Sequence, residues 1–261
     1  MVRPSADWNL VQRDMSAAND FPPTKCTFRY LICSTPRSGS WLLCSGLTAT
    51  GAAGRPAEYL SGPFTEAYKL RFGLSAITLN QYWQFLLRHR TSPNGVFGLK
   101  MHFDHVLAHF KDEAVRRNMP CAFDRLIFLT RRDKLGQAIS FWKANTTGIY
   151  RQPADGDRPR PREAPYYNFE EIARRLADIA NQEASWRAIL ASVPDRVVSL
   201  TYEDLSERYP ESMRQVLTAL GLESAIDTLD PAPNLAPQRD ELDQEWRRRF
   251  LEDTGQGRQV A

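Results

Sequence analysis

The sequence predicts an α/β protein with a central parallel β-sheet flanked by helices. Short apolar runs of strand length alternate with longer helical patterns along most of the 261 residues, without an internal repeat. Strands and helices that alternate in this way form parallel sheets with right-handed crossovers. The apolar run at 125–130 is nearly continuous, as expected for a strand buried on both faces. The length fits one domain of generous size.

Four strands are expected, and each is followed by a helical pattern. The strands are expected at residues 28–34, 96–101, 125–130 and 197–200. The helices are expected at 40–50, 65–72 and 79–89, from Asp104, from about 134 to 145, at 169–190, from Tyr202 to near Gly221, and at 240–252. Gly51 closes the first helix, and Asn94-Gly95 forms the turn into the second strand. Residues 150–165 are rich in Pro and Arg and predict a long loop.

The chain divides into a polar N-terminal extension, residues 1–25, and one domain, residues 26–261. The formal charge of +3 does not indicate a nucleic-acid-binding protein. The longest apolar runs are far shorter than the roughly 20 residues of a membrane helix, and the N-terminus has no apolar signal-peptide core. The four cysteines lack CxxC spacing. We therefore expect a cytoplasmic protein in a reducing compartment.

The segment between the first strand and its helix predicts an anion-binding loop. It reads Thr35-Pro36-Arg37-Ser38-Gly39-Ser40-Trp41. The free N–H groups of a helix N-terminus attract phosphate or sulfate, Gly39 permits close approach of the backbone, and Arg37 adds a forked cation. An ordinary turn with Ser40 as the N-cap is the alternative. The loop lacks the Lys of a Walker A motif and the three glycines of a dinucleotide-binding motif.

A second candidate anion site follows the third strand. Arg132 lies just after this strand, and Ser140 lies eight residues later on the next helix, so that both can reach one phosphate. The alternative is a surface ion pair of Arg131 or Arg132 with Asp133. Lys100 ends the second strand. Because ligands bind beyond the carboxyl ends of parallel strands, these residues together predict a pocket for a polyanionic nucleotide.

These two motifs resemble the nucleotide site of sulfotransferases that use 3′-phosphoadenosine 5′-phosphosulfate (PAPS). The bacterial branch that includes the trehalose and nodulation-factor sulfotransferases is the most similar. Its conserved blocks resemble TGAAGRPAEYL, NGVFGLKMHFDH, FLTRRDKLGQAISFWKA and APQRDELDQEWRRRF, in the same order from about Tyr30 to Phe250. The resemblance implies a P-loop-like sulfotransferase fold, a homodimer and a carbohydrate or glycolipid acceptor.

The resemblance also implies roles for individual residues. Five residues would bind the 5′-phosphosulfate of PAPS, and Arg132 and Ser140 would hold its 3′-phosphate. The five are Arg37, Ser38, Gly39, Ser40 and Trp41. Glu58 would be the general base that accepts the proton of the acceptor hydroxyl, with in-line displacement of the leaving group, and Arg37 and Lys100 would complete the catalytic set. Lys100 would stabilise charge near the sulfuryl group or order the site.

Two departures from the family pattern lie on the acceptor side. Arg55 stands where the family has an acidic residue, and Phe103 where it has Trp. The donor site is unchanged, but the resemblance leaves the acceptor open. A Mg²⁺-dependent small-molecule kinase is one alternative function, although it would require a Walker lysine. A non-catalytic module that binds a nucleotide or a sulfated glycan is the other.

The chemistry of sulfuryl transfer needs no metal, and we expect none. The spacing of His102, His105 and His109 invites comparison with a metal site, but no HExxH pattern is present. His102 follows Lys100 closely and is expected to line the mouth of the active site. His105 and His109 are expected to be ordinary helix residues. Arg239 and the run 247–249 are candidates to reach the nucleotide, with a solvated helix face as the alternative for the run.

Overall fold

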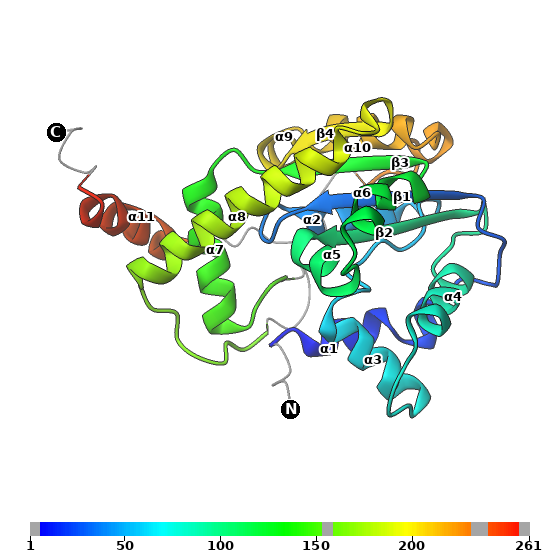
Figure 1. Cartoon of the computed structure of the whole chain (residues 1–261), viewed down its shortest axis with the longest axis horizontal. Coiled ribbons are helices and arrows are strands. Elements are labelled where there is room, and N and C mark those ends of the chain that lie inside the picture. Colours follow the sequence, from blue (N-terminus) through cyan, green and yellow to red (C-terminus); the bar gives the residue numbers. More distant parts are fainter. Residues whose placement is uncertain (1–5, 153–158, 231–239, 256–261) are drawn as a thin grey trace.

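A four-stranded parallel sheet forms the centre of the computed structural model, which describes residues 6–152, 159–230 and 240–255 (Figure 1). Its strand order is β2-β1-β3-β4. The strands are β1 (Phe28–Ser34), β2 (Val96–His102), β3 (Arg125–Thr130) and β4 (Val197–Thr201). All four predicted strands are confirmed, and β2 and β4 extend one residue further than expected. The expected single-domain α/β fold with a parallel sheet is therefore confirmed.

Helices cover both faces of the sheet, and most occupy the predicted segments. The bounds are α1 (Trp8–Asp14), α2 (Ser40–Ala49), α3 (Gly62–Phe72), α4 (Leu79–His89), α5 (Phe103–His109), α6 (Glu113–Asn118), α7 (Lys134–Thr147), α8 (Phe169–Leu190), α9 (Tyr202–Glu207), α10 (Tyr209–Ala219) and α11 (Glu241–Asp253). Short 3₁₀ turns lie at 17–19, 119–122, 194–196 and 223–225. The helical region expected from Tyr202 is divided into α9 and α10 at Arg208. No helix within the described residues is long and apolar enough to cross a membrane.

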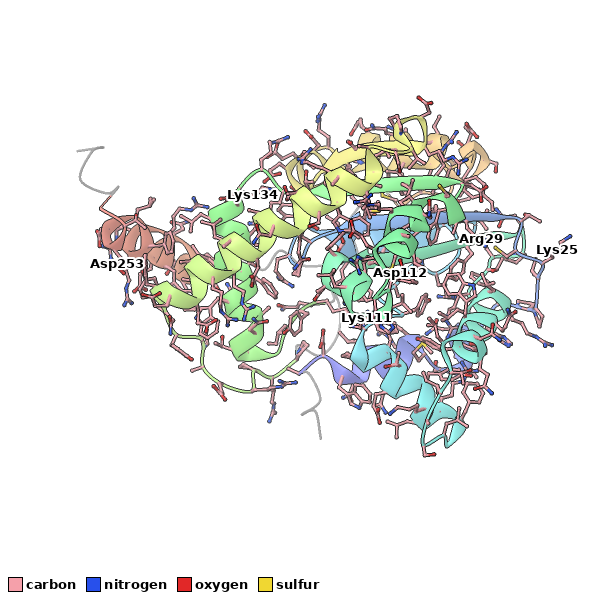
Figure 2. The ribbon with its side chains drawn as sticks, in the orientation of Figure 1. Lys25, Arg29, Lys111, Asp112, Lys134 and Asp253 are labelled. Carbon is pink, nitrogen blue, oxygen red and sulfur yellow. The ribbon has the colours of Figure 1, made fainter. Side chains whose placement is uncertain are left out.

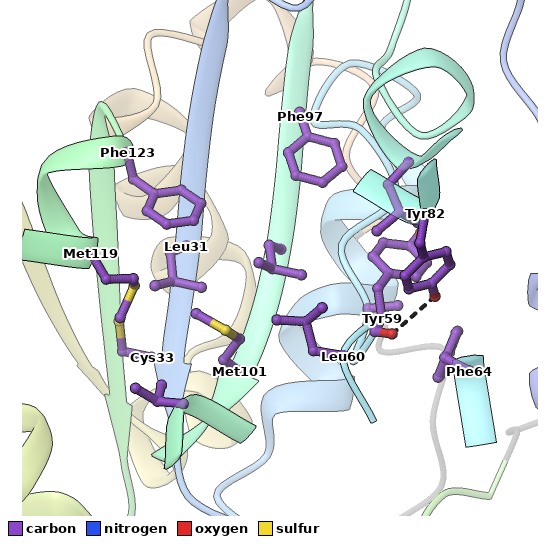
Figure 3. Packing of buried hydrophobic residues seen from close by; sticks show 14 of the residues in the cluster. Leu31, Cys33, Tyr59, Leu60, Phe64, Tyr82, Phe97, Met101, Met119 and Phe123 are labelled. Atoms are coloured by element: carbon purple, nitrogen blue, oxygen red, sulfur yellow. Dashed lines mark hydrogen bonds between the residues drawn. The ribbon is translucent and has the colours of Figure 1, made fainter. Parts of the chain in front are cut away.

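The alternating side chains of β1 divide the core into two layers. Leu31 and Cys33 pack in one cluster with residues of α4, α5 and α8, whereas Tyr30 and Ile32 pack in another with residues of α2 and α10. Figure 3 shows part of the first cluster, in which Tyr82 donates a hydrogen bond of 2.9 Å to the carbonyl of Tyr59. A third cluster joins α7, α8 and α11. Lys134, labelled in Figure 2, begins α7 and forms an ion pair with Glu183 of α8, which joins these two helices.

The strand register places all four carboxyl ends at one edge of the sheet. Ser34 of β1 is level with His102 of β2 and Leu129 of β3, and Thr130 is level with Thr201 of β4. The segments that follow the strands start at this edge, including the predicted anion loop. The fold therefore brings the predicted site residues to one place.

The N-terminal extension, which the sequence predicts to be polar and partly ordered, contributes a helix to the core. Residues 8–14 form α1, which packs against α3, and Val11 and Met15 are buried in the core. The carboxylate of Asp20 pairs with Arg71 at 2.5 Å and with Arg90 at 2.5 Å. The Arg90 side chain is fully buried. The end of α1 accepts hydrogen bonds from Arg90, to the carbonyl of Asp14, and from Arg71, to the carbonyl of Met15; because these partners lie 76 and 56 positions away, no local pattern reveals the contacts.

Gly98 permits the close packing of β2 on β1, and its substitution tests this part of the core. A Cβ at Gly98 would overlap the ring of Tyr30, whose hydroxyl donates to the carbonyl of Ala53 at 2.7 Å. We expect Gly98→Ala to lower the free energy of unfolding by about 1–3 kcal/mol, because overpacking forces neighbouring groups apart. Urea unfolding measures this change. Gly62→Ala is the control, since a Cβ there meets nothing within 4 Å; equal stability of the two variants would contradict the prediction.

Candidate active site

The loop between β1 and α2 has the backbone of an anion-binding turn. Arg37 has a φ of 64° and Gly39 a φ of 82°, both in the left-handed region. A Cβ at Gly39 would also overlap the ring of Tyr202, so that only glycine fits there. The helix begins at Ser40, and the N–H groups of Leu42 and Leu43 already donate to the carbonyl of Gly39, whereas those of Ser40 and Trp41 come too early in the helix for a partner within it. These groups, together with the helix dipole, favour an anion at the loop.

The interior of the loop is held by hydrogen bonds from neutral side chains. Gln137 of α7 donates to Thr35 Oγ1 at 2.8 Å and to the carbonyl of Pro36 at 2.7 Å. Ser38 is fully buried, and its hydroxyl donates to the carbonyl of Thr35 at 2.9 Å. The Ser38 side chain therefore supports the loop and does not line the cavity described below. This placement differs from the direct role expected for the hydroxyl.

Two arginines and a serine meet beside the loop. Arg37 Nε donates to Ser140 Oγ at 3.0 Å, and Arg131 donates to the carbonyl of Arg37 at 3.2 Å. Burial, and then the neighbouring charge of Arg131, lower the pKa of Arg37 to about 10. Arg37 remains cationic at neutral pH. The two guanidinium groups thus concentrate positive charge where the loop would receive an anion.

The structure places Arg131, and not Arg132, in this group. The Arg132 side chain is 54% exposed and its Nη1 pairs with Asp204 Oδ2 at 3.0 Å. Hydrogen bonds from Thr201 and Arg208, together with Arg132, lower the pKa of Asp204 to about 2. Successive side chains at a strand end point in opposite directions, so only one of the two neighbours enters the site. Ser140, which the sequence predicts to share one phosphate with Arg132, is contacted by Arg37.

Glu58 lies among three basic side chains at the same edge of the sheet. Its Oε1 pairs with Lys100 Nζ and lies 3.0 Å from His102 Nε2. Burial raises the pKa of Glu58, but Lys100 and His102, with a smaller contribution from His105, lower it by more. The pKa therefore lies well below its usual range. Glu58 is ionised at neutral pH and is placed to accept a hydrogen bond from a hydroxyl in the cavity.

Lys100 is the buried cation that pairs with Glu58. Its side chain is fully buried, contacts Ser40 Oγ at 3.3 Å, and lies over the ring of Trp41 with Nζ 3.8 Å from the ring centroid. Lys100 is not among the residues that line the cavity. Of the two roles considered for this lysine, the geometry favours ordering of the site.

His102 connects Glu58 to the end of β1. Its Nδ1 lies 3.1 Å from Ser34 Oγ, opposite the Nε2 that faces Glu58. If the Ser34 hydroxyl donates to Nδ1, Nε2 carries the proton and donates to Glu58. The neighbouring His105 ring lies 5.3 Å away, and burial, followed by the charge of His102, lowers the pKa of His105 to about 4. His102 lines the cavity, as expected.

These residues surround a cavity of about 950 Å³. Its wall includes Arg37, Gly39, Ser40, Trp41, Glu58, His102, Arg131 and Ser140. Other parts of the wall come from α1, α7 and α11, and from Arg151 and Arg162 beside α7. A cavity of this size is within the range of ligand sites, and it joins the anion loop to Glu58.

Sequence reasoning missed several residues of this site. The sequence names both Arg131 and Arg132 at this strand end but gives the phosphate role to Arg132 alone, although strand alternation could have separated the two. Gln137 and Tyr202 act through contacts that form only in the fold. Arg247 of α11 lines the cavity and pairs with Asp133, whereas Arg248 and Arg249 pair with glutamates of their own helix. Arg239 lies outside the described residues.

A comparison with protein families gives a match over residues 29–253 to the Stf0 sulphotransferase model. The chain belongs to the Stf0 sulphotransferase family. The match includes the anion loop, Glu58, Lys100 and α7, and it begins after α1. The resemblance to bacterial sulfotransferases is therefore confirmed. Among the described residues, no group of three or more His, Cys, Asp or Glu side chains is arranged to hold a metal ion.

Two trehalose 2-sulfotransferases are similar to this Stf0 sulphotransferase along nearly their whole length. The Mycobacterium tuberculosis enzyme is 27% identical over 255 residues, which cover 85% of this chain and 93% of the enzyme. The Mycolicibacterium smegmatis enzyme is 28% identical over 258 residues, which cover 86% of this chain and 94% of the enzyme.

Solved structures of other sulfotransferases are more distant. The sulfotransferase domain from the curacin biosynthetic pathway has a TM-score of 0.48 and 15% identity, with 89% of this chain and 99% of that domain covered. A sulfotransferase from Alicyclobacillus acidocaldarius has a TM-score of 0.47 and 12% identity, with coverage of 89% and 94%.

Proposed function

We propose that this chain transfers a sulfuryl group from PAPS to a hydroxyl of a carbohydrate or glycolipid acceptor. One observation carries the proposal. The ionised carboxylate of Glu58, held by Lys100 and His102, lines the same cavity as the anion loop with its Arg37. An anion site and a base in one cavity are the two groups that sulfuryl transfer to a hydroxyl requires.

The residues present fit the donor. The cavity volume of about 950 Å³ suits a nucleotide-sized ligand, and cationic side chains line the side of the anion loop. The loop from Arg37 to Trp41 would hold the 5′-phosphosulfate. We assign the 3′-phosphate to Arg131 with Ser140, because Arg131 lines the cavity and the exposed Arg132 pairs with Asp204. PAPS supplies the activated sulfuryl group.

Glu58 and the loop would divide the chemical work. The acceptor oxygen forms a bond to sulfur while the bond from sulfur to the 5′-phosphate oxygen breaks. Glu58 accepts the hydroxyl proton, and Arg37 with the α2 N-terminus stabilises the negative charge that develops on the leaving phosphate. The products are a sulfate ester and adenosine 3′,5′-bisphosphate. The low pKa of Glu58 makes it a weak base; it therefore takes the proton late, when the new S–O bond has made the hydroxyl acidic.

The acceptor class rests on the two relatives, which are both trehalose 2-sulfotransferases. A disaccharide such as trehalose is one acceptor within this class, together with an oligosaccharide or a lipopolysaccharide sugar. A homodimer and a cytoplasmic location complete the proposal. The resemblance to the family supports the first, and the four free cysteines support a reducing compartment for the second.

Calorimetric titration with adenosine 3′,5′-bisphosphate, without added metal, tests the donor site. We expect micromolar binding by the wild type and binding weakened at least about tenfold in Arg131→Ala, a loss of about 1.4 kcal/mol. Arg132→Ala is the matched control and is expected to bind within about twofold of the wild type, because its side chain lies outside the cavity.

The outcomes separate the alternatives. Loss of binding in Arg132→Ala but not in Arg131→Ala would return the 3′-phosphate to Arg132. Absence of binding by the wild type, or binding only of ATP with Mg²⁺, would overturn the sulfotransferase proposal and favour a kinase.

A further inference from the structure

A second cavity of about 410 Å³ lies beside the first. Its wall is formed by α1 and the turn after it, by one side of α2, and by the segment 55–59 that leads to Glu58. Tyr59, Cys44 and Ala57 form apolar parts of this wall, whereas Ser45 and Thr48 add hydroxyl groups. The cavity therefore combines an apolar surface with groups that can bind a sugar ring.

The two cavities meet at Trp41 and Arg151, which line both. The guanidinium of Arg151 lies over the Trp41 ring, 4.3 Å from its centroid, and Lys100 Nζ lies over the same ring at 3.8 Å. Lys100 in turn pairs with Glu58. Trp41 thus belongs to the wall that the two cavities share and contacts the lysine that holds the base. An acceptor with its hydroxyl at Glu58 would extend into the second cavity once it is larger than a single sugar.

The second cavity carries an excess of positive charge. Three arginines line it, namely Arg13, Arg55 and Arg151, but only one carboxylate, that of Asp14. Asp14 pairs with Arg151. Within the described residues no carboxylate lies within 4 Å of the guanidinium of Arg13 or Arg55. Neither guanidinium therefore forms an ion pair within the described residues, although the charges of Asp14 and Asp20 act on Arg55 from a greater distance.

Arg55 is held in place by its surroundings. Its guanidinium lies 4.9 Å from the centroid of the Phe21 ring, and its Nε is buried without a hydrogen-bond partner. Its carbonyl accepts a hydrogen bond from the hydroxyl of Tyr59, and its backbone N–H donates to the carbonyl of Arg90 at 3.2 Å. A half-buried guanidinium that forms no ion pair is available to bind an anion, since it pairs with phosphate, sulfate or carboxylate through two parallel hydrogen bonds.

We propose that the second cavity binds an anionic group carried by the sugar acceptor, a phosphate, a sulfate or a carboxylate, through Arg55 and Arg13. This inference rests on the proposed function and narrows its acceptor to negatively charged carbohydrates. Arg13 and Asp14 belong to α1, which precedes the region that matches the family model. The N-terminal segment thus contributes, together with Arg55, to selection of the acceptor.

The test measures binding of matched neutral and anionic sugars to the full chain. The protein is first saturated with adenosine 3′,5′-bisphosphate, so that the phosphate sites of the first cavity are filled. Calorimetric titrations then compare trehalose with trehalose 6-phosphate, glucose with glucuronate, and N-acetylglucosamine with its 6-sulfate. We expect the anionic member of at least one pair to bind at least about tenfold more tightly, as a charge-assisted bidentate contact allows.

Single substitutions then test whether Arg55 and Arg13 cause the preference for anionic over neutral sugars. Arg55→Gln and Arg13→Gln are each expected to reduce it at least about threefold, and they should leave the affinity for adenosine 3′,5′-bisphosphate unchanged. Arg13 is exposed on α1, so its substitution does not endanger folding. Arg214→Gln makes the same change of charge on α10, outside both cavities, and should not alter the preference.

The possible results distinguish failure of the anionic-acceptor inference from failure of the proposed function. Equal binding of neutral and anionic sugars in all pairs, no detectable binding of either, or a preference that survives both substitutions would overturn this inference and leave the donor site intact. Failure of the first step, the binding of adenosine 3′,5′-bisphosphate, would instead overturn the proposed function itself.

Discussion

Glu58→Gln is expected to lower the rate of sulfuryl transfer by about 10²–10⁴-fold, the usual contribution of a general base. The amide of glutamine has nearly the shape of the carboxylate, but it cannot accept the proton of the acceptor hydroxyl. Donor binding should change little, because the anion loop contacts the nucleotide independently of this carboxylate. The measurement is the formation of adenosine 3′,5′-bisphosphate from PAPS in the presence of the sugar acceptor, together with the affinity for this product.

Two controls show whether a lower rate comes from the loss of the base or from the loss of any carboxylate or of the fold. Glu66→Gln removes an exposed carboxylate of α3 that pairs with Lys69 and lies outside the cavity, and it should leave the rate unchanged. Thermal unfolding of Glu58→Gln reports the cost of leaving Lys100 without its carboxylate. A variant that stays folded and binds the nucleotide but keeps the full rate would remove Glu58 from the mechanism. A non-catalytic binding module would have no transfer rate to lose.

The fold was predictable from the sequence because its main features are local. Alternating apolar runs define the strands, and the turn from Thr35 to Ser40 defines the loop where the first helix begins. The strand ends then converge, because parallel strands place their carboxyl ends at one edge. The sequence therefore predicts that the loop and Lys100 belong to one site, and the structure brings them together.

The details of the site depended on contacts between distant segments. Glu58 became a candidate only through the resemblance to known sulfotransferases, since an isolated Glu in a loop carries no signal of its own. Its pairing with Lys100 joins an irregular segment to β2. The end of α1 also depends on distant partners. Val11 and the following Met15 are buried although the segment is polar, and Arg71 and Arg90 donate hydrogen bonds to the carbonyls of Met15 and Asp14.

The second large effect concerns Lys100. Lys100→Met removes the positive charge beside Glu58 and keeps much of the side-chain volume. Burial would then dominate, and the pKa of Glu58 is expected to rise from well below its usual range. The loss of one partner from a buried ion pair should also destabilise the fold, by about 3–5 kcal/mol at most, since His102 still contacts the carboxylate.

The expected sign of the pH dependence follows from this shift. In the wild type the depressed pKa keeps Glu58 ionised, so its titration should not lower the rate between pH 5 and pH 8, a window above the usual carboxylate range. In Lys100→Met the rate should fall as the pH decreases through the raised pKa and recover as the pH increases. Stability should respond in the matching sense. The native ion pair contributes stability above the pKa of unfolded glutamate, and the wild type loses that contribution as the pH falls towards the folded pKa.

Rate profiles of the two proteins at saturating PAPS test this prediction. Lys134→Met is the matched control, because it removes an ion pair with Glu183 on α8 and lies outside the cavity. It should keep the wild-type profile. If Lys100→Met lowers the rate by the same factor at every pH, Lys100 acts on the sulfuryl group or on folding and does not tune Glu58. If the rate of Lys100→Met instead falls at a higher pH than that of the wild type, while Lys134→Met keeps the wild-type profile, Lys100 is the group that keeps the carboxylate of Glu58 ionised for the acceptor hydroxyl.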